Sequence, residues 1–215
     1  IFNEPSAFAG IVIKGMPSTA RVVEGPVPDW KKFGRANAGN GGDGTAIGLP
    51  HFETASFLAR FPFATLEITD KDLSIKSKVT GWSPFIPTDE DNSSLPVAGL
   101  EYQFTNVSTK SVDAVFSFNS KNFLKVDKGK NLISSMKNGF VLTEMGTKEK
   151  PLRTDLAIFT DEENLTVDHC WFRGGWWDPF TMAWNAVKNA EINEVAPVES
   201  DAPGASLYIP IHLAA

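Results

Sequence analysis

Residues 81–108, GWSPFIPTDEDNSSLPVAGLEYQFTNVS, constrain the fold of this chain more than any other stretch. Pro84 and Pro87 each fix φ and remove a backbone donor, which excludes segment 82–88 from helices and from central strands. After the acidic turn at 89–94, apolar and polar residues alternate with a period of two, which predicts a strand with one buried face. The residues predicted to face the core are Ala98, Leu100, Tyr102 and Phe104.

The proline-containing segment Trp82–Pro87 forms an elbow that carries two large apolar side chains, Phe85 and Ile86. Two prolines preset its backbone and so lower the entropy that is lost on folding. We therefore expect the elbow to be a stability element, with Phe85 in the core, and not a ligand site.

The same period of two recurs along the chain between short polar turns. Strands are predicted at 7–13, 20–24, 61–69, 72–80, 97–105, 111–119, 139–145, 154–160, 164–172 and 206–213. Short turns favour antiparallel pairing, because parallel strands need crossovers of about a dozen residues or more. The chain is therefore predicted to be all-β, an antiparallel β-sandwich with at most one or two short helices, whose core includes Phe116 and Phe118.

One short helix is predicted at about residues 180–190. Asp178 suits the N-cap, and Pro179 suits the first helical position. Apolar residues then recur at a spacing of three and four, as expected of a helix with one buried face. These residues are Phe180, Ala183, Trp184 and Val187.

Composition limits the partners that this chain can have. The formal net charge is −6, and no run of basic residues occurs. We therefore expect no nucleic-acid partner and no association with anionic membranes. No apolar run approaches the roughly 20 residues of a membrane-spanning helix. Cys170 is the single cysteine and lies in an apolar stretch, so it is predicted to be a buried structural thiol.

The acidic run Asp89, Glu90 and Asp91 is a candidate catalytic or calcium site. The EF-hand pattern fails, because its sixth and twelfth positions are occupied by Ser94 and Leu100. Adjacent carboxylates on a turn also point in different directions. A solvated, turn-stabilising run is the better interpretation.

Other motifs that carry chemistry are weak. His51, His169 and His212 are far apart and match no metal-ligand spacing, so structural roles are expected. Residues 39–44 satisfy GxGxxG, but no strand precedes them and no helix follows, so a flexible loop is favoured over a nucleotide site. We therefore expect no catalytic residue, no metal ligand and no cofactor in this chain.

Residues 171–178, WFRGGWWD, place three tryptophans around two glycines. Three interpretations are open: a plug in the sandwich core, an anchor between domains, or a platform on which a sugar stacks. The candidate residues for a carbohydrate or interdomain contact are Trp176, Trp177 and Asp178.

Several of these stretches together resemble a known family. SPFIP at 83–87, the acidic run and SSLPVAGLEYQFTN at 93–106 look like the signature of the amino-terminal domain of glycoside hydrolase family 116. RFPFATL at 60–66 and DAPG at 201–204 resemble further pieces of that domain. The resemblance extends over residues 52 to 213 in order, and it is specific over 60–107.

The resemblance implies a supersandwich-like β-domain that packs beside an (α/α)-barrel catalytic domain in the same chain. The whole enzyme would be a retaining β-glucosidase of the non-lysosomal glucosylceramidase or bile-acid β-glucosidase type, acting on a glycoside. The family's catalytic carboxylates belong to the carboxy-terminal domain, and none of them maps onto this chain. The chain itself would be a non-catalytic support for the catalytic domain, and part of the rim of the substrate cleft.

Residues 1–215 are accordingly expected to form a single β-sandwich domain, cut at both ends from a longer enzyme. The chain starts at Ile1 without a methionine, and its last residues, SLYIPIHLAA, alternate without a following turn. The alternative is a free-standing carbohydrate-binding or structural β-sandwich module. That alternative predicts a planar row of exposed tryptophans.

Overall fold

The computed structural model describes residues 7–29, 46–124, 130–149, 151–176 and 178–215. Within these residues the strands pair in antiparallel fashion in three sheets, and the fold is an all-β sandwich with 47% strand. The predicted fold class is confirmed. No helix in the described ranges is long and apolar enough to cross a membrane.

The chain divides into two compact units. The first consists of residues 1–22, 28–50 and 113–212, and the second consists of residues 23–27, 51–112 and 213–215. The expectation that residues 1–215 make one sandwich domain stays a prediction.

A five-stranded sheet forms the centre of the first unit. Its order is β11 (Thr166–Asp168), β12 (Gly204–Leu213), β7 (Val112–Lys121), β1 (Ala7–Ile13) and β2 (Arg21–Val22). The short 3-10 helices η1 (Pro17–Thr19) and η2 (Ala46–Gly48) belong to the same unit. On the β11 side the ladder of β12 stops at Tyr208, so Pro210 lies where no partner on that side needs its N–H.

A three-stranded sheet completes the first unit, in the order β10 (Arg153–Phe159), β9 (Gly139–Met145) and β8 (Lys130–Met136). β8 and β9 form a hairpin whose turn places Asn138 at φ 54°, a left-handed conformation that asparagine tolerates. The sequence alone did not predict β8, because residues 120–131, where the strand begins, are rich in lysine. Such a composition is typical of a solvated loop. Pairing with β9 decides its conformation.

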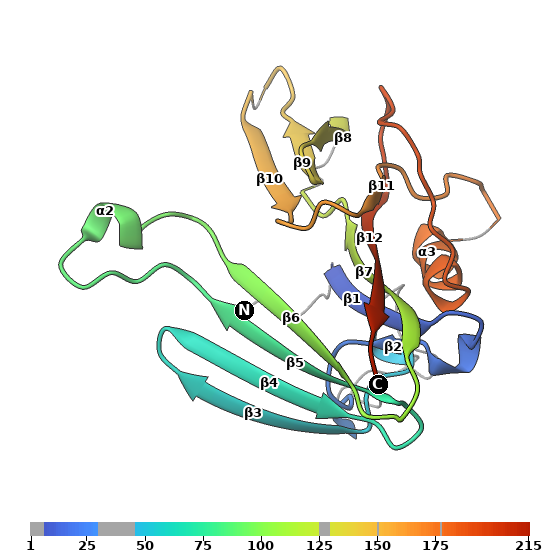
Figure 1. The fold of residues 1–215 in the computed structure, drawn as a ribbon. Coiled ribbons are helices and arrows are strands. Elements are labelled where there is room, and N and C mark those ends of the chain that lie inside the picture. The colour runs from blue at the N-terminus through green and yellow to red at the C-terminus, as the bar shows by residue number, and fades with distance from the viewer. Residues whose placement is uncertain (1–6, 30–45, 125–129, 150, 177) are drawn as a thin grey trace. The chain divides into compact units, whose positions relative to one another are not determined.

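Two apolar cores cover the two faces of the five-stranded sheet (Figure 1). On one face, α3 (Pro179–Lys188) packs through Phe180, Trp184 and Val187 against Phe8 and Tyr208. On the other face the three-stranded sheet packs through a second set of residues. This second core includes Ile133, Phe140, Leu142, Ala205 and Leu207. α3 confirms the predicted helix.

The central strand β7 is buried on both of its faces. Val115 belongs to the core under α3, and Phe118 packs against the core on the opposite face. Ala114 and Phe116 are buried as well. The sequence pattern predicted one buried face only, because serine and asparagine alternate with the aromatic residues and look like solvent-facing positions.

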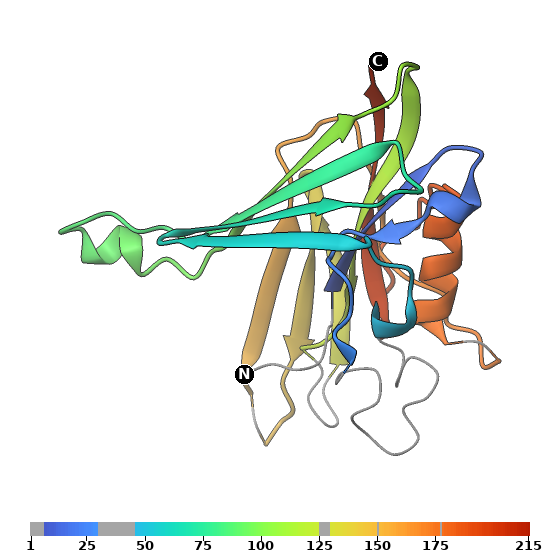
Figure 2. The same ribbon diagram turned by 90° about the horizontal axis from the view of Figure 1, so that it is seen from below.

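The second unit is an antiparallel meander, in the order β3 (Thr54–Arg60), β4 (Phe63–Thr69), β5 (Ile75–Trp82) and β6 (Gly99–Asn106) (Figures 1 and 2). β3 was not predicted from the sequence. Every residue of β3 is exposed, so the strand has no buried face to produce a pattern, and only its pairing with β4 identifies it.

One face of this meander is apolar along the register. Phe57, Leu66, Val79 and Tyr102 lie opposite one another across the four strands. Tyr102 and Phe104 are half-buried, but Leu100 is 53% exposed. The prediction that Leu100 is buried between sheets is therefore wrong. Alternation correctly predicted which residues share a face, but not whether that face is covered.

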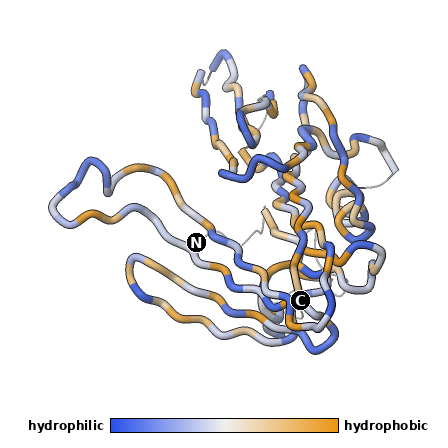
Figure 3. The backbone as a smooth tube through the Cα atoms, in the orientation of Figure 1, coloured by the Kyte–Doolittle hydropathy of each residue, from blue (hydrophilic) through white to orange (hydrophobic). Residues whose placement is uncertain are grey.

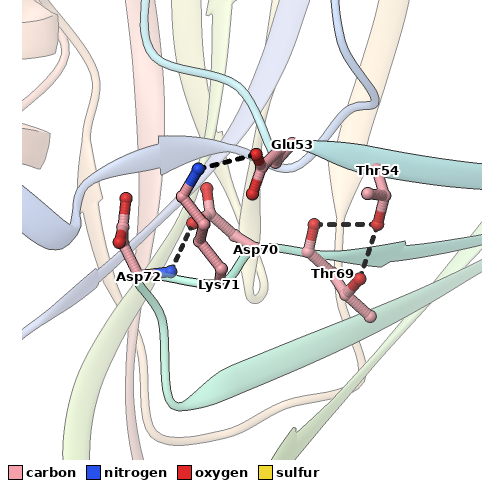
Figure 4. A network of polar contacts seen from close by, with 6 residues as sticks. All are labelled: Glu53, Thr54, Thr69, Asp70, Lys71 and Asp72. Carbon is pink, nitrogen blue, oxygen red and sulfur yellow. Dashed lines mark hydrogen bonds and ion pairs between the residues drawn. The ribbon is translucent and has the colours of Figure 1, made fainter.

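The turn between β4 and β5 spans residues 70–74, where the sequence predicted a turn of only two residues, 70–71, and it is held by polar contacts (Figure 4). The Lys71 Nζ donates to Glu53 Oε1 at 2.9 Å, and this bond raises the pKa of Lys71. The Asp72 amide donates to Asp70 Oδ1 at 2.9 Å. The first contact ties the turn to the residue that precedes β3, and the second lies within the turn.

Residues 83–98 connect β5 to β6 as an arm that extends beyond the ends of both strands (Figure 1). The arm contains the short helix α2 (Glu90–Ser93) where the acidic turn was predicted. Phe85 and Ile86, the apolar residues of the elbow, are both 48% exposed. The expected core position of Phe85 is therefore wrong.

Candidate functional site: the tryptophan loop of residues 171–178

The loop begins in the core of the first unit. Trp171 is only 3% exposed, and its backbone N–H donates to Gly204 O at 3.0 Å. A Cβ on Gly204 would lie 2.5 Å from the Trp171 ring and 2.6 Å from Ser120 O, so only glycine fits there. Of the three interpretations of the tryptophans, the core plug holds for Trp171.

A buried chain of hydrogen bonds continues from Trp171. Its Nε1–H donates to Ser206 Oγ at 2.8 Å, and the Ser206 hydroxyl donates to Asn119 Oδ1 at 2.7 Å. The Asn119 side-chain amide then donates to Ser117 Oγ at 2.9 Å. Buried polar groups need such partners, so this chain explains why polar residues occupy one face of β7.

The DAPG segment supports the same region from the other side. Asp201 Oδ1 accepts from the Asn131 amide at 3.0 Å, and the Ala202 amide donates to Asn131 O at 3.2 Å. The Asn122 amide donates to Pro203 O at 2.9 Å. Residues 201–204 therefore join the ends of β7 and β8 to the start of the loop.

Asp168, His169 and Cys170 precede the loop, and their order in the sequence resembles a catalytic set. Their contacts do not. Asp168 Oδ1 accepts from the Cys170 amide at 2.9 Å, and the His169 ring bonds Val195 O at 2.9 Å. Burial raises the pKa of both Asp168 and Cys170. The Cys170 thiol donates to Trp171 O, and a thiol whose pKa is raised by burial is not an activated nucleophile, so Cys170 is the buried structural thiol that was predicted.

The middle of the loop turns outward to solvent. Gly174 lies so close to the Phe172 ring that a Cβ there would be 1.9 Å from Cζ. Arg173 Nη1 donates to Ser200 Oγ at 2.5 Å, which ties the loop to the segment before β12. Trp176 is 94% exposed. Trp176 is therefore not part of the core.

The loop ends at the start of α3. Asp178 Oδ1 accepts from the Phe180 and Thr181 amides at 2.9 and 3.0 Å, so its carboxylate is the N-cap predicted from the sequence. Desolvation opposes its ionisation, but these bonds and one from the Thr181 hydroxyl outweigh it and lower the pKa of Asp178. Trp177 lies outside the described residues. A carbohydrate or interdomain contact through Trp176, Trp177 and Asp178 stays a prediction.

The remaining sequence candidates have structural partners. Asp89 Oδ1 accepts from the Asn92 amide at 3.0 Å and caps α2. His212 Nδ1 lies 2.6 Å from Asp113 Oδ1 in an exposed pair, and His51 Nε2 lies 3.6 Å from Glu24 Oε2. In the described ranges no three His, Cys, Asp or Glu side chains gather as a metal site. The glycine-rich segment 39–44 lies outside these ranges.

Comparison with known proteins bears directly on the resemblance noted in the sequence. No curated protein sequence matches this chain. A family model does match, over residues 7–215, and its description is "beta-glucosidase 2, glycosyl-hydrolase family 116 N-term". The match includes the elbow, the tryptophan loop and the DAPG segment. The chain therefore belongs to the family of amino-terminal domains of family 116 glycoside hydrolases.

Proposed function

We propose that this chain is the non-catalytic amino-terminal domain of a retaining β-glucosidase, and that its tryptophan loop contacts the catalytic domain of the same chain. Membership of a family of amino-terminal domains implies a companion catalytic domain. The observation that carries the contact is Trp176, 94% exposed on a loop whose two ends are fixed. The expected companion is an (α/α)-barrel, and part of the rim of its substrate cleft comes from this domain.

A fixed loop makes Trp176 suitable as an anchor. Trp171 is buried at one end of the loop, and Asp178 caps α3 at the other. Both attachments lower the entropy lost when the loop is immobilised against a partner. Tryptophan at the centre of an interface is also among the residues whose removal weakens binding most.

The proposed substrate is supported by the family description and not by the geometry of this chain. A β-glucosidase of this family cleaves β-glucosides, and we propose glucosylceramide or a related glycoside as the natural substrate. Retaining enzymes use two carboxyl groups about 5–5.5 Å apart, one as the nucleophile and one as the acid–base. Both are assigned to the companion domain.

The alternative is a carbohydrate-binding module, in which Trp176 stacks on a sugar ring. Its exposure also suits that role, because an aromatic face is a common platform for sugars. The two roles predict different effects of one substitution, Trp176→Ala, in the whole protein. Loss of a domain contact lowers the melting temperature, whereas loss of a sugar platform raises KM and leaves the melting temperature unchanged.

The experiment compares Trp176→Ala with Leu152→Ala in the whole protein. Leu152, which is 74% exposed, is an apolar control in the same unit. We expect Trp176→Ala to lower the melting temperature by several degrees and the control to leave it unchanged. If both variants melt like the parent while KM for an aryl β-glucoside rises only for Trp176→Ala, the module interpretation replaces ours.

A second measurement tests the assignment of the chemistry. Asp89→Asn and Asp91→Asn in the whole protein should keep kcat for an aryl β-glucoside within about twofold, because neither acts in catalysis. Loss of turnover in either variant, with folding intact by circular dichroism, would place a catalytic carboxyl in this domain and overturn the proposal.

A further inference from the structure

The arm of residues 83–98 exposes several large apolar side chains. Figure 3 shows hydrophobic segments on both limbs of the arm, on either side of a hydrophilic tip. Phe85, Ile86, Leu95 and Val97 are each between 44% and 52% exposed. Phe61, at the end of the β3–β4 hairpin, is 78% exposed. We call these five side chains the arm surface. Exposed apolar groups gathered in this way mark interaction sites in soluble proteins.

The arm is internally braced. The Ser93 hydroxyl accepts from the Ile86 amide at 2.9 Å and donates to Ile86 O at 3.1 Å, so one serine joins the two limbs. Asp89 accepts from both the amide and the side chain of Asn92, and these bonds lower its pKa. The elbow prolines fix the backbone further. An element braced in this way is preorganised for binding, because it loses little conformational entropy when it binds.

The arm is also attached to the sheet through an aromatic contact. The Phe61 and Phe85 rings meet edge to face, with centroids 4.7 Å apart. Both rings keep large exposed fractions, so the contact orients them and does not bury them. It extends the apolar surface from the arm to the end of the β3–β4 hairpin.

The apolar face of the meander continues into this surface. Gly81 pairs with Leu100 at the end of β5 and β6 from which the arm leaves, and Leu100 is exposed on that face. Ile68 and Ser77, toward the other end of the same face, are buried. One face is therefore buried at one end and open at the end that carries the arm.

Charge limits what can cover the arm surface. The arm contains Asp89, Glu90 and Asp91 but no lysine or arginine. An anionic membrane would repel this tip. Two copies that packed arm against arm would also oppose like charges, which costs free energy at an interface. The surface instead fits a protein with an apolar recess and basic groups at its rim.

We propose that the arm surface is a second docking element for the companion catalytic domain, one that inserts into an apolar recess of that domain. The inference rests on the proposed function, since it takes its partner from there. It assigns a role to Phe85 and Ile86 that neither a core position nor a solvated turn explains. The acidic tip at α2 would face basic residues of the catalytic domain.

Photo-cross-linking in the whole protein tests this proposal. Phe85 is replaced by the photoreactive analogue p-benzoylphenylalanine, and Phe159 is replaced in the same way as a control. Phe159 is an exposed phenylalanine of β10 in the other unit. After irradiation, we expect the Phe85 position to be joined to a peptide that lies beyond residue 215 of the same chain, with a yield several times that of the control.

A pair of substitutions provides the second measurement. Ile86→Asp should lower the melting temperature of the whole protein, whereas Val107→Asp should not. Val107 is similarly exposed in the same unit but follows β6 at its opposite end. Cross-links from the Phe85 position to a second copy, or only to residues 1–215, would overturn the proposal, as would yields equal to the control.

Failure of this inference can be told apart from failure of the proposed function. If the whole protein hydrolyses an aryl β-glucoside with retention and Trp176→Ala lowers the melting temperature, the proposed function stands. In that case, cross-links that do not reach the catalytic domain reject only the proposal that the arm docks there. If the whole protein contains no glycosidase domain, both fail together.

Discussion

Asp168 is a buried carboxyl with one clear hydrogen-bond donor, the Cys170 amide. Burial raises its pKa, so the folded state binds a proton more readily than the unfolded state does. The stability that Asp168 contributes is therefore greatest below its ordinary pKa of 3.8 and declines as pH rises toward the raised value.

We predict that Asp168→Asn leaves stability at pH 7 unchanged or increases it. Asparagine keeps the acceptor oxygen and removes the buried charge. Asp168→Ala leaves the Cys170 amide without its partner, which costs about 1–3 kcal/mol. Urea unfolding of the two variants at pH 7 is the measurement. If asparagine destabilises the protein as much as alanine does, the carboxylate charge itself is required.

The N-cap of α3 gives the opposite pH dependence. The pKa of Asp178 is lowered, so its contribution is present above the ordinary value of 3.8 and is lost as pH falls through the lowered value. We predict that Asp178→Ala costs about 1 kcal/mol at pH 7, a typical value for loss of an N-cap. Asp178→Asn should retain most of the stability that the cap contributes. Because asparagine does not titrate, the loss of stability in acid should also be smaller. Thermal melts between pH 2 and pH 7, about the range over which carboxyls titrate, measure both effects.

At the scale of elements, the arm and β9 each contain a phenylalanine, and the two differ in burial. Phe140 of β9 is fully buried in the core between the two sheets of the first unit, whereas Phe85 of the arm is half-exposed. We predict that Phe140→Ala destabilises the 215-residue chain by about 3–5 kcal/mol, since a cavity adds to the lost transfer energy. Phe85→Ala should cost about 1 kcal/mol or less, as substitutions away from the core do.

Denaturant unfolding of both variants against the parent tests this pair. The small effect of Phe85→Ala follows from its exposed ring, which already contacts water in the folded chain. A cost for Phe85→Ala as large as that for Phe140→Ala would show that the elbow is buried after all. It would restore the role in stability expected from the prolines.

For the whole molecule, the antiparallel sheets determine the spectroscopic signature. Strands account for 47% of the chain, and α3 is the only described helix of seven residues or more. We predict a far-ultraviolet circular dichroism spectrum of β type, with over twice as much strand as helix. A spectrum dominated by helical minima would contradict the fold.

The sequence by itself determined those elements whose signals are local. The alternation in β1, β9 and β12, and the cap, proline and apolar spacing of α3, depend on neighbouring residues only, and the structure confirms each of them. The signature around the elbow likewise predicted the family. Asp178 of the candidate site belongs to this class, since it precedes a proline at a helix start.

The tertiary structure decided which of these elements are covered. β3 and β8 became strands through pairing with β4 and β9, and β7 gained its second buried face from α3, which packs in the same core as Val115. Trp171 and Trp176 are the same residue type five positions apart, yet one is buried and the other is in solvent. Alternation and spacing specify which side chains point together. Burial depends on what distant parts of the chain place against them, and that information is not local.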